Sequence, residues 1–84
     1  MTTEQLQEGK MYFIQYGENT CVLVRFKKAD STRLYYFSHL HYWNGFETFH
    51  NGGESVKSGI TNIREASKPE KHSLFGKEIE HGTI

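Results

Sequence analysis

The chain has 84 residues, enough for one small domain and too few for separate cofactor-binding and substrate-binding domains. Ten basic residues balance ten acidic ones, so the overall charge does not favour binding to nucleic acid or to an anionic membrane surface. Cys21 is alone, which excludes an intramolecular disulfide, and without a secretion signal or a long apolar run we expect a cytoplasmic protein that does not enter a membrane.

The first predicted elements are a helical turn and two strands. Thr2 and Gln5 have the spacing of a capping box, which indicates one helical turn over 2–9. Alternating apolar residues then predict strands over 10–16 and 20–28, joined by a turn that contains glycine.

Shorter strands follow a long third one. Aromatic and branched residues predict a strand over 32–42, and the Asn-Gly pair after it signals a tight hairpin turn. Further strands are predicted over 46–50, 54–57 and 60–65, separated by glycine-containing turns.

The last predicted element is a helix over about 68–81. Ser67 can cap it, Pro69 lies in its first turn, and Glu70 completes a capping box. Three apolar residues of this helix are expected to rest on the sheet: Leu74, Phe75 and Ile79.

These elements predict a mainly β single domain over 1–84, with the β part over about 10–66 and a C-terminal helix. We expect a small SH3-like or half-open antiparallel barrel of five to six short strands. The alternative is an open antiparallel sheet packed on one helix.

Both faces of the predicted sheet carry apolar residues. One core should contain Ile14, Val22, Val24, Phe26, Leu34, Tyr36 and Ile63. A second apolar surface should contain Phe13, Cys21, Leu23, Tyr35 and Phe37. One short helix offers little cover for the second surface, so we expect part of it to meet a protein partner or a second copy of the chain.

More than half of the aromatic residues lie between Arg33 and Phe49. Beside the Asn-Gly turn, Trp43 either folds back over the end of the barrel, which we expect, or serves as a contact anchor. The aromatic residues that we expect to form a binding surface are Tyr35, Phe37, Tyr42, Trp43 and Phe46.

Four basic residues surround the predicted hairpin between the second and third strands: Arg25, Lys27, Lys28 and Arg33. Together with the nearby aromatic residues they match the mixture of cations and stacking surfaces that binds single-stranded nucleic acid. The favoured interpretation is a solvated hairpin tip whose charges prevent pairing between sheet edges.

A histidine pattern raises the possibility of a metal site. His39 and His41 project to the same side of a strand, and Glu47 or His50 on the next strand could complete a ligand set. The spacing of His39, His41 and Glu47 resembles the first metal motif of cupins, which implies a small metal-dependent enzyme. Arg33 stands where that motif has glycine, and the second cupin motif is absent.

We expect neither a bound metal or cofactor nor catalysis. The register that would place Glu47 depends on the hairpin turn, and a slip of one residue would turn its side chain away. Cys21 lies in a predicted strand, where a cysteine is typically a small apolar residue and not a nucleophile. The sequence therefore favours a non-catalytic β binding module, with protein–protein interaction or self-association first and single-stranded nucleic acid second.

Overall fold

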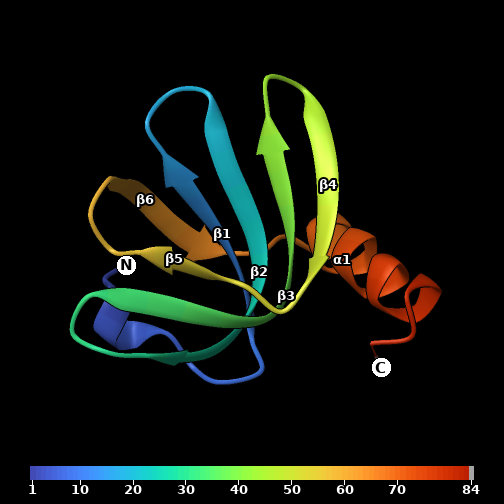
Figure 1. Cartoon of the computed structure of the whole chain (residues 1–84), viewed down its shortest axis with the longest axis horizontal. Coiled ribbons are helices and arrows are strands. Elements are labelled where there is room, and N and C mark those ends of the chain that lie inside the picture. The colour runs from blue at the N-terminus through green and yellow to red at the C-terminus, as the bar shows by residue number, and fades with distance from the viewer. Residues whose placement is uncertain (84) are drawn as a thin grey trace.

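Six antiparallel strands form one open sheet, and one helix packs against it (Figure 1). The structure is a computed structural model that describes residues 1–83. The elements in chain order are η1 (Thr3–Gln5), β1 (Met11–Tyr16), β2 (Thr20–Ala29), β3 (Arg33–Trp43), β4 (Phe46–Asn51), β5 (Glu54–Val56), β6 (Ile60–Glu65) and α1 (Lys68–Glu80). The expected mainly β fold with a C-terminal helix is confirmed, and the open sheet packed on one helix corresponds to the second of the two expected architectures.

The strands lie in the order β4-β3-β2-β1-β6, and β5 pairs with the first half of β3. In Figure 1, β5 crosses in front of the sheet, whereas α1 lies behind it next to β4. We call the side of β5 the concave face and the side of α1 the helix face. Within residues 1–83, no helix has the length and apolar character needed to cross a bilayer.

Two extra residues bend the sheet. The pairing of β2 with β3 is irregular at Lys27 in β2 and at Phe37 in β3, each of which is additional to the partner strand. Such bulges bend strands and increase their twist. In Figure 1, β3 accordingly turns from a nearly horizontal course in its first half to an upright one in its second half. The bent ends of β2 and β3, together with β5, therefore curl over the concave face.

The hairpin between β3 and β4 is a two-residue turn. Asn44 and Gly45 both have positive φ angles, 49° and 82°, as the mirror-image turns of tight hairpins require. This turn fixes the register, because it places Trp43 directly opposite Phe46. The predicted Asn-Gly turn is confirmed.

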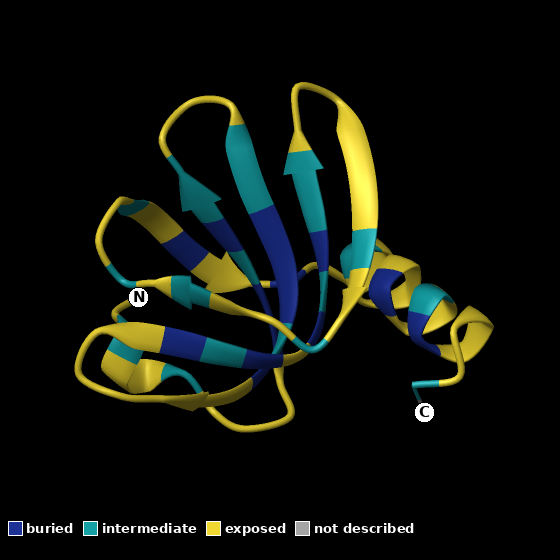
Figure 2. Ribbon diagram, in the orientation of Figure 1, coloured by how far each residue is buried: buried dark blue, intermediate teal, exposed yellow. Residues whose placement is uncertain are grey.

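The core of the concave face has the expected composition. All seven predicted residues are buried and belong to one cluster, which Tyr12 joins: Ile14, Val22, Val24, Phe26, Leu34, Tyr36 and Ile63. Figure 2 shows this burial concentrated in the middle of the sheet, whereas β4 is mostly exposed. The prediction of the first core is confirmed.

The helix contacts the sheet through a different set of side chains from the one expected. Ser67 caps α1 and forms a capping box with Glu70, as predicted. Leu74 is buried, but Phe75 and Ile79 are exposed, so the prediction for those two residues is wrong. The helix turns Leu74 and Glu78, which are four residues apart and share one face, toward the sheet.

Glu78 is fully buried, and two residues of the sheet form three hydrogen bonds with it. Its carboxylate accepts hydrogen bonds from Arg25 Nε and Nη2, at 2.7 and 2.8 Å, and from Ser38 Oγ at 2.5 Å. Burial alone would raise the pKa of Glu78, but the bonds from Arg25 and Ser38 outweigh it and lower the pKa. The charged pair therefore joins α1 to β2 and β3.

The second apolar surface is only partly where the sequence places it. Leu23 is buried and Phe13 half-buried on the helix face, together with Leu40 and Leu74. Tyr35 and Phe37 do not join them, because they lie in the bent first half of β3, where Phe37 is the additional residue of the bulge. The expected continuous surface from Phe13 to Phe37 is wrong.

Candidate binding surface

The most exposed aromatic side chains lie at the tip of the β3–β4 hairpin. Trp43 and Phe46 are 53% and 72% exposed and face each other as a cross-strand pair. The indole does not fold back over the sheet, so that expectation is wrong. The register of the hairpin places Trp43 on the concave face, opposite Phe46.

A groove of about 380 Å³ lies on the same face, between β5 and the ends of β1, β2 and β3. His41 lines it and is two residues before Trp43 on β3, so both side chains project to the same side. The lining residues are Tyr16, Thr20, Val22, Tyr36, His39, His41, Glu54, Ser55 and Val56. We call the groove and the Trp43–Phe46 pair together the concave surface.

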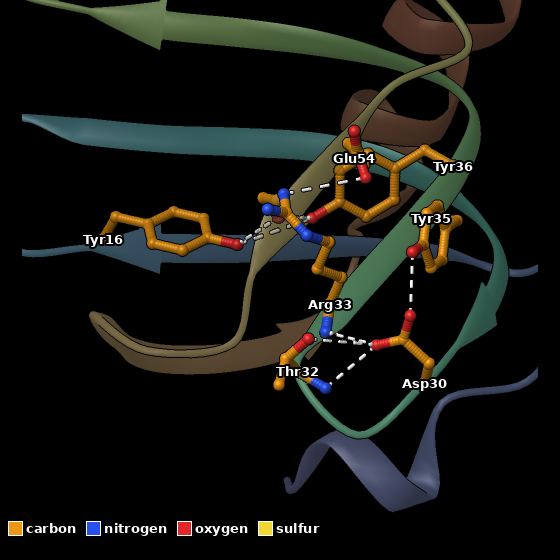
Figure 3. A network of polar contacts seen from close by, with 8 residues as sticks. Tyr16, Asp30, Thr32, Arg33, Tyr35, Tyr36 and Glu54 are labelled. Carbon is orange, nitrogen blue, oxygen red and sulfur yellow. Dashed lines mark hydrogen bonds and ion pairs between the residues drawn. The ribbon is translucent and has the colours of Figure 1, made fainter.

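Three hydroxyl groups meet at the wall of the groove (Figure 3). Ser55 Oγ is 2.5 Å from Tyr16 Oη and also contacts Tyr36 Oη, and the two tyrosine oxygens are 3.5 Å apart. Figure 3 shows Tyr16 and Tyr36 pointing toward each other from β1 and β3. Burial raises the pKa of Tyr36, so this phenol keeps its proton at neutral pH.

Three imidazoles lie side by side on the concave face. His39 stacks on His50 with 4.8 Å between ring centroids, and His41 meets His50 edge-on at 6.5 Å. Burial lowers the pKa of His39, and the neighbouring His50 and His41 lower it further, while a bond to Gly52 partly opposes the change. His39 is therefore neutral at neutral pH.

The turn between β4 and β5 closes around His39. His39 Nδ1 lies 2.8 Å from the carbonyl oxygen of Gly52. A carbonyl can only accept, so Nδ1 carries the proton and Nε2 keeps a free lone pair. A Cβ atom at Gly53 would collide with the His39 ring, so this position requires glycine. His39 thus holds the turn that leads into β5.

The other predicted aromatic residues lie elsewhere. Tyr42 is half-buried on the helix face, where burial and then Glu47 raise its pKa to about 12. Tyr35 donates a hydrogen bond to Asp30 Oδ2 at 2.8 Å, as Figure 3 shows. Phe37 lies at the bulge with Lys27 Nζ 5.7 Å from its ring centroid. Only Trp43 and Phe46 of the five predicted aromatic residues contribute to the concave surface.

The four basic residues do not form one free patch. Arg25 is bound by Glu78 on the helix face, and Arg33 Nη1 lies 3.7 Å from Glu54 Oε2. Lys27 and Lys28 lie over the rings of Phe37 and Tyr35. Two of the four charges are therefore paired with carboxylates of the chain itself.

The predicted metal ligands are separated. His39 and His41 share the concave face, but Glu47 pairs with Tyr42 and so lies on the helix face. The residue beside the two histidines is His50. Among residues 1–83, no group of three histidine, cysteine or acidic side chains is arranged to hold a metal ion. The cupin-like set of His39, His41 and Glu47 therefore does not converge.

Cys21 also lies on the helix side, half-buried. Burial raises the pKa of its thiol, Glu70 raises it further, and Arg64 opposes the change. A protonated thiol is a weak nucleophile.

Tyr16 and Ser55 of the groove wall had no place among the sequence-derived candidates. They could not be found from the sequence, because their contact depends on the bend of the sheet. His50 was a candidate beside His39 and His41, and the two-residue turn at Asn44-Gly45 indeed pairs it directly with His39.

Comparison with known proteins finds the fold but no family. No protein-family model matches the chain, and no curated protein is detectably similar. A solved structure, described as the crystal structure of the NatC complex bound to CoA, contains a similar chain: the TM-score is 0.60 at 12% identity, over 80% of this chain and 87% of that chain. At this identity the likeness shows a shared fold alone.

Proposed function

We propose that this chain is a non-catalytic binding module that holds a protein partner on its concave surface. The observation that carries the proposal is the exposed Trp43–Phe46 pair beside the groove. Aromatic residues at the centre of an interface supply a large contact area at low entropic cost, and tryptophan is the residue most enriched among interface anchors.

The hairpin suits an anchoring role because it is already ordered. Its tight turn and continuous pairing with β3 fix the two aromatic side chains before binding, which reduces the entropy lost on association. The similar chain noted above belongs to a structure described as a complex, which is consistent with a protein partner for this fold.

The chemistry of the concave surface favours binding over catalysis. The hydroxyls of Tyr16, Tyr36 and Ser55 bond to one another, and within residues 1–83 no hydrogen bond links any of them to an imidazole or a carboxylate that would activate it as a nucleophile. Nucleic acid receives less support, since Arg25 is already bound by the buried Glu78.

Affinity capture from the cells in which the protein occurs, followed by quantitative mass spectrometry, tests the proposal. We expect Phe46→Ser to lose the main partner and Phe75→Ser to retain it, because Phe75 is also exposed, though less than Phe46, and lies on α1. Equal retention by both variants would contradict the proposal. Captured nucleic acid that is lost at high salt would instead favour the alternative, single-stranded nucleic-acid binding.

A further inference from the structure

We propose that the groove receives a basic side chain, lysine or arginine, from an extended segment of the partner protein. This inference rests on the proposed function and adds the chemistry of the partner. It follows from the hydrogen-bonding groups, the charge and the shape of the groove.

The polar groups of the groove are mainly acceptors. His39 Nδ1–H is used by the Gly52 carbonyl, so the ring offers only the Nε2 lone pair to a ligand. The hydroxyls of Tyr16, Tyr36 and Ser55 can donate their hydrogen bonds to one another, which leaves lone pairs on the oxygens for a donor of the ligand. The groove is therefore complementary to a ligand that carries N–H donors. A ligand that carries only acceptors would find no partners among these groups.

A carboxylate lies at the β5 rim of the groove. Glu54 is the acidic residue among the lining residues, and the lining contains neither lysine nor arginine. The Glu54 carboxylate already attracts one guanidinium, that of Arg33, at 3.7 Å, and both side chains are about half exposed. A pair this long and this exposed is weak, so a cation from a partner can share or replace Arg33.

The remaining lining suits the stem of a basic side chain. Val22, Val56 and the ring of Tyr16 provide carbon surface, and the Trp43 indole at the edge of the same face can lie against a cation. Lysine and arginine combine an apolar stem with a charged head, and they bury the stem while the head finds acceptors. A volume of about 380 Å³ accommodates such a side chain.

Acid should oppose this binding. The titratable groups that face the site are His39, His41, His50, Tyr16, Tyr36 and Glu54. Burial lowers the pKa of His39 from its usual 6.5, and protonation of this ring would place positive charge beside the bound cation. Binding should therefore weaken as the pH falls below about 6.5.

NMR titration of the isolated chain with small probes tests the inference directly. The probes are the Nα-acetyl methylamides of arginine and lysine, and the neutral controls are those of citrulline and norleucine. We expect the cationic probes to shift the backbone amides of His39, His41 and Ser55 at about pH 7.5, and to shift them less at about pH 5.5. Equal or stronger binding of norleucine, or shifts confined to another surface, would overturn the inference.

A pair of acidic variants separates this inference from the proposed function. Glu54→Gln should weaken the cationic probes about two- to fivefold, the effect of losing one partly exposed ion pair. Glu47→Gln is the matched control, because Glu47 is also exposed but lies on the helix face. If Phe46→Ser abolishes capture of the partner while Glu54→Gln leaves both probe and partner binding unchanged, the proposed function stands and the basic side chain is refuted.

Discussion

The two faces of the sheet have similar apolar content but different covers. On the helix face, α1 packs Leu74 against Leu23 and Leu40 and bonds to the sheet through the buried Glu78. On the concave face, the bent ends of β2 and β3 and the short β5 cover only one end of the sheet, and Trp43 and Phe46 stay exposed at the other. The cover, and not the composition, decides which face is available to a partner.

The largest effect should come from the core of the concave face. Phe26→Ala should lower the free energy of unfolding by about 3–5 kcal/mol, because it removes a buried ring from a small core. Phe46→Ala should change it by no more than about 0.5 kcal/mol, since that ring is exposed. Urea unfolding of both variants measures the contrast, and a large loss for Phe46→Ala would mean that the hairpin tip is structural.

Breaking the ion pair of the helix face should cost nearly as much. Arg25→Met leaves Glu78 buried without its cation, so we expect a loss of about 3–5 kcal/mol in the free energy of unfolding. The double variant Arg25→Met with Glu78→Met should recover most of it, because the uncompensated charge is gone. A double-mutant cycle by urea unfolding checks this, and additive losses would show that the pair is not coupled.

The cap of α1 should have a moderate effect. Ser67→Ala removes the oxygen that accepts a bond from the Glu70 backbone, and we expect a loss of about 1 kcal/mol. Ser73→Ala on the same helix is the control, since its hydroxyl only bonds back to Pro69 and its removal should be almost neutral. Thermal unfolding followed by circular dichroism distinguishes the two, and equal losses would argue against the cap.

The smallest effect should be a difference in how the two faces respond to acid. His39 has a folded-state pKa below its usual 6.5, so the stability it contributes is present above that pH and is lost as the pH falls below it. Glu78 has a pKa below its usual 4.5, so its contribution is lost only as the pH falls below 4.5. The free energy of unfolding should therefore decline in two stages. In His39→Gln the upper stage should flatten and the lower should remain, and an unchanged upper stage would assign it to other groups.

Local patterns in the sequence predicted the elements well, because each depends on neighbours in the chain. The alternation around Val24, the Asn44-Gly45 turn and the Ser67 cap all act within a few residues. The position of Tyr35 was not accessible in this way, since it depends on the bend that the additional residue at Phe37 introduces, and a bulge leaves no periodic signal.

The candidate site was predictable at the hairpin tip and in the pair His39 and His41, which share one side of β3. Trp43 and Phe46 were found because an exposed turn and large aromatic residues are both visible in the sequence. The roles of Glu78 and Ser55 depend on residues far away in the chain. Glu78 bonds to Arg25, and Ser55 bonds to Tyr16. Such contacts between residues far apart in the chain carry no periodic signature.

The width of the groove depends on the two bulges of the sheet, although neither bulge residue lines the groove. Lys27 and Phe37 are additions to an otherwise regular ladder, so either could be lost in evolution without removing any other pair between β2 and β3. What would change is the angle at which β5 leans over the concave face, and with it the width of the groove. Insertions and deletions at these two remote positions are therefore a route by which relatives of this chain could acquire differently shaped sites while keeping every residue that lines them.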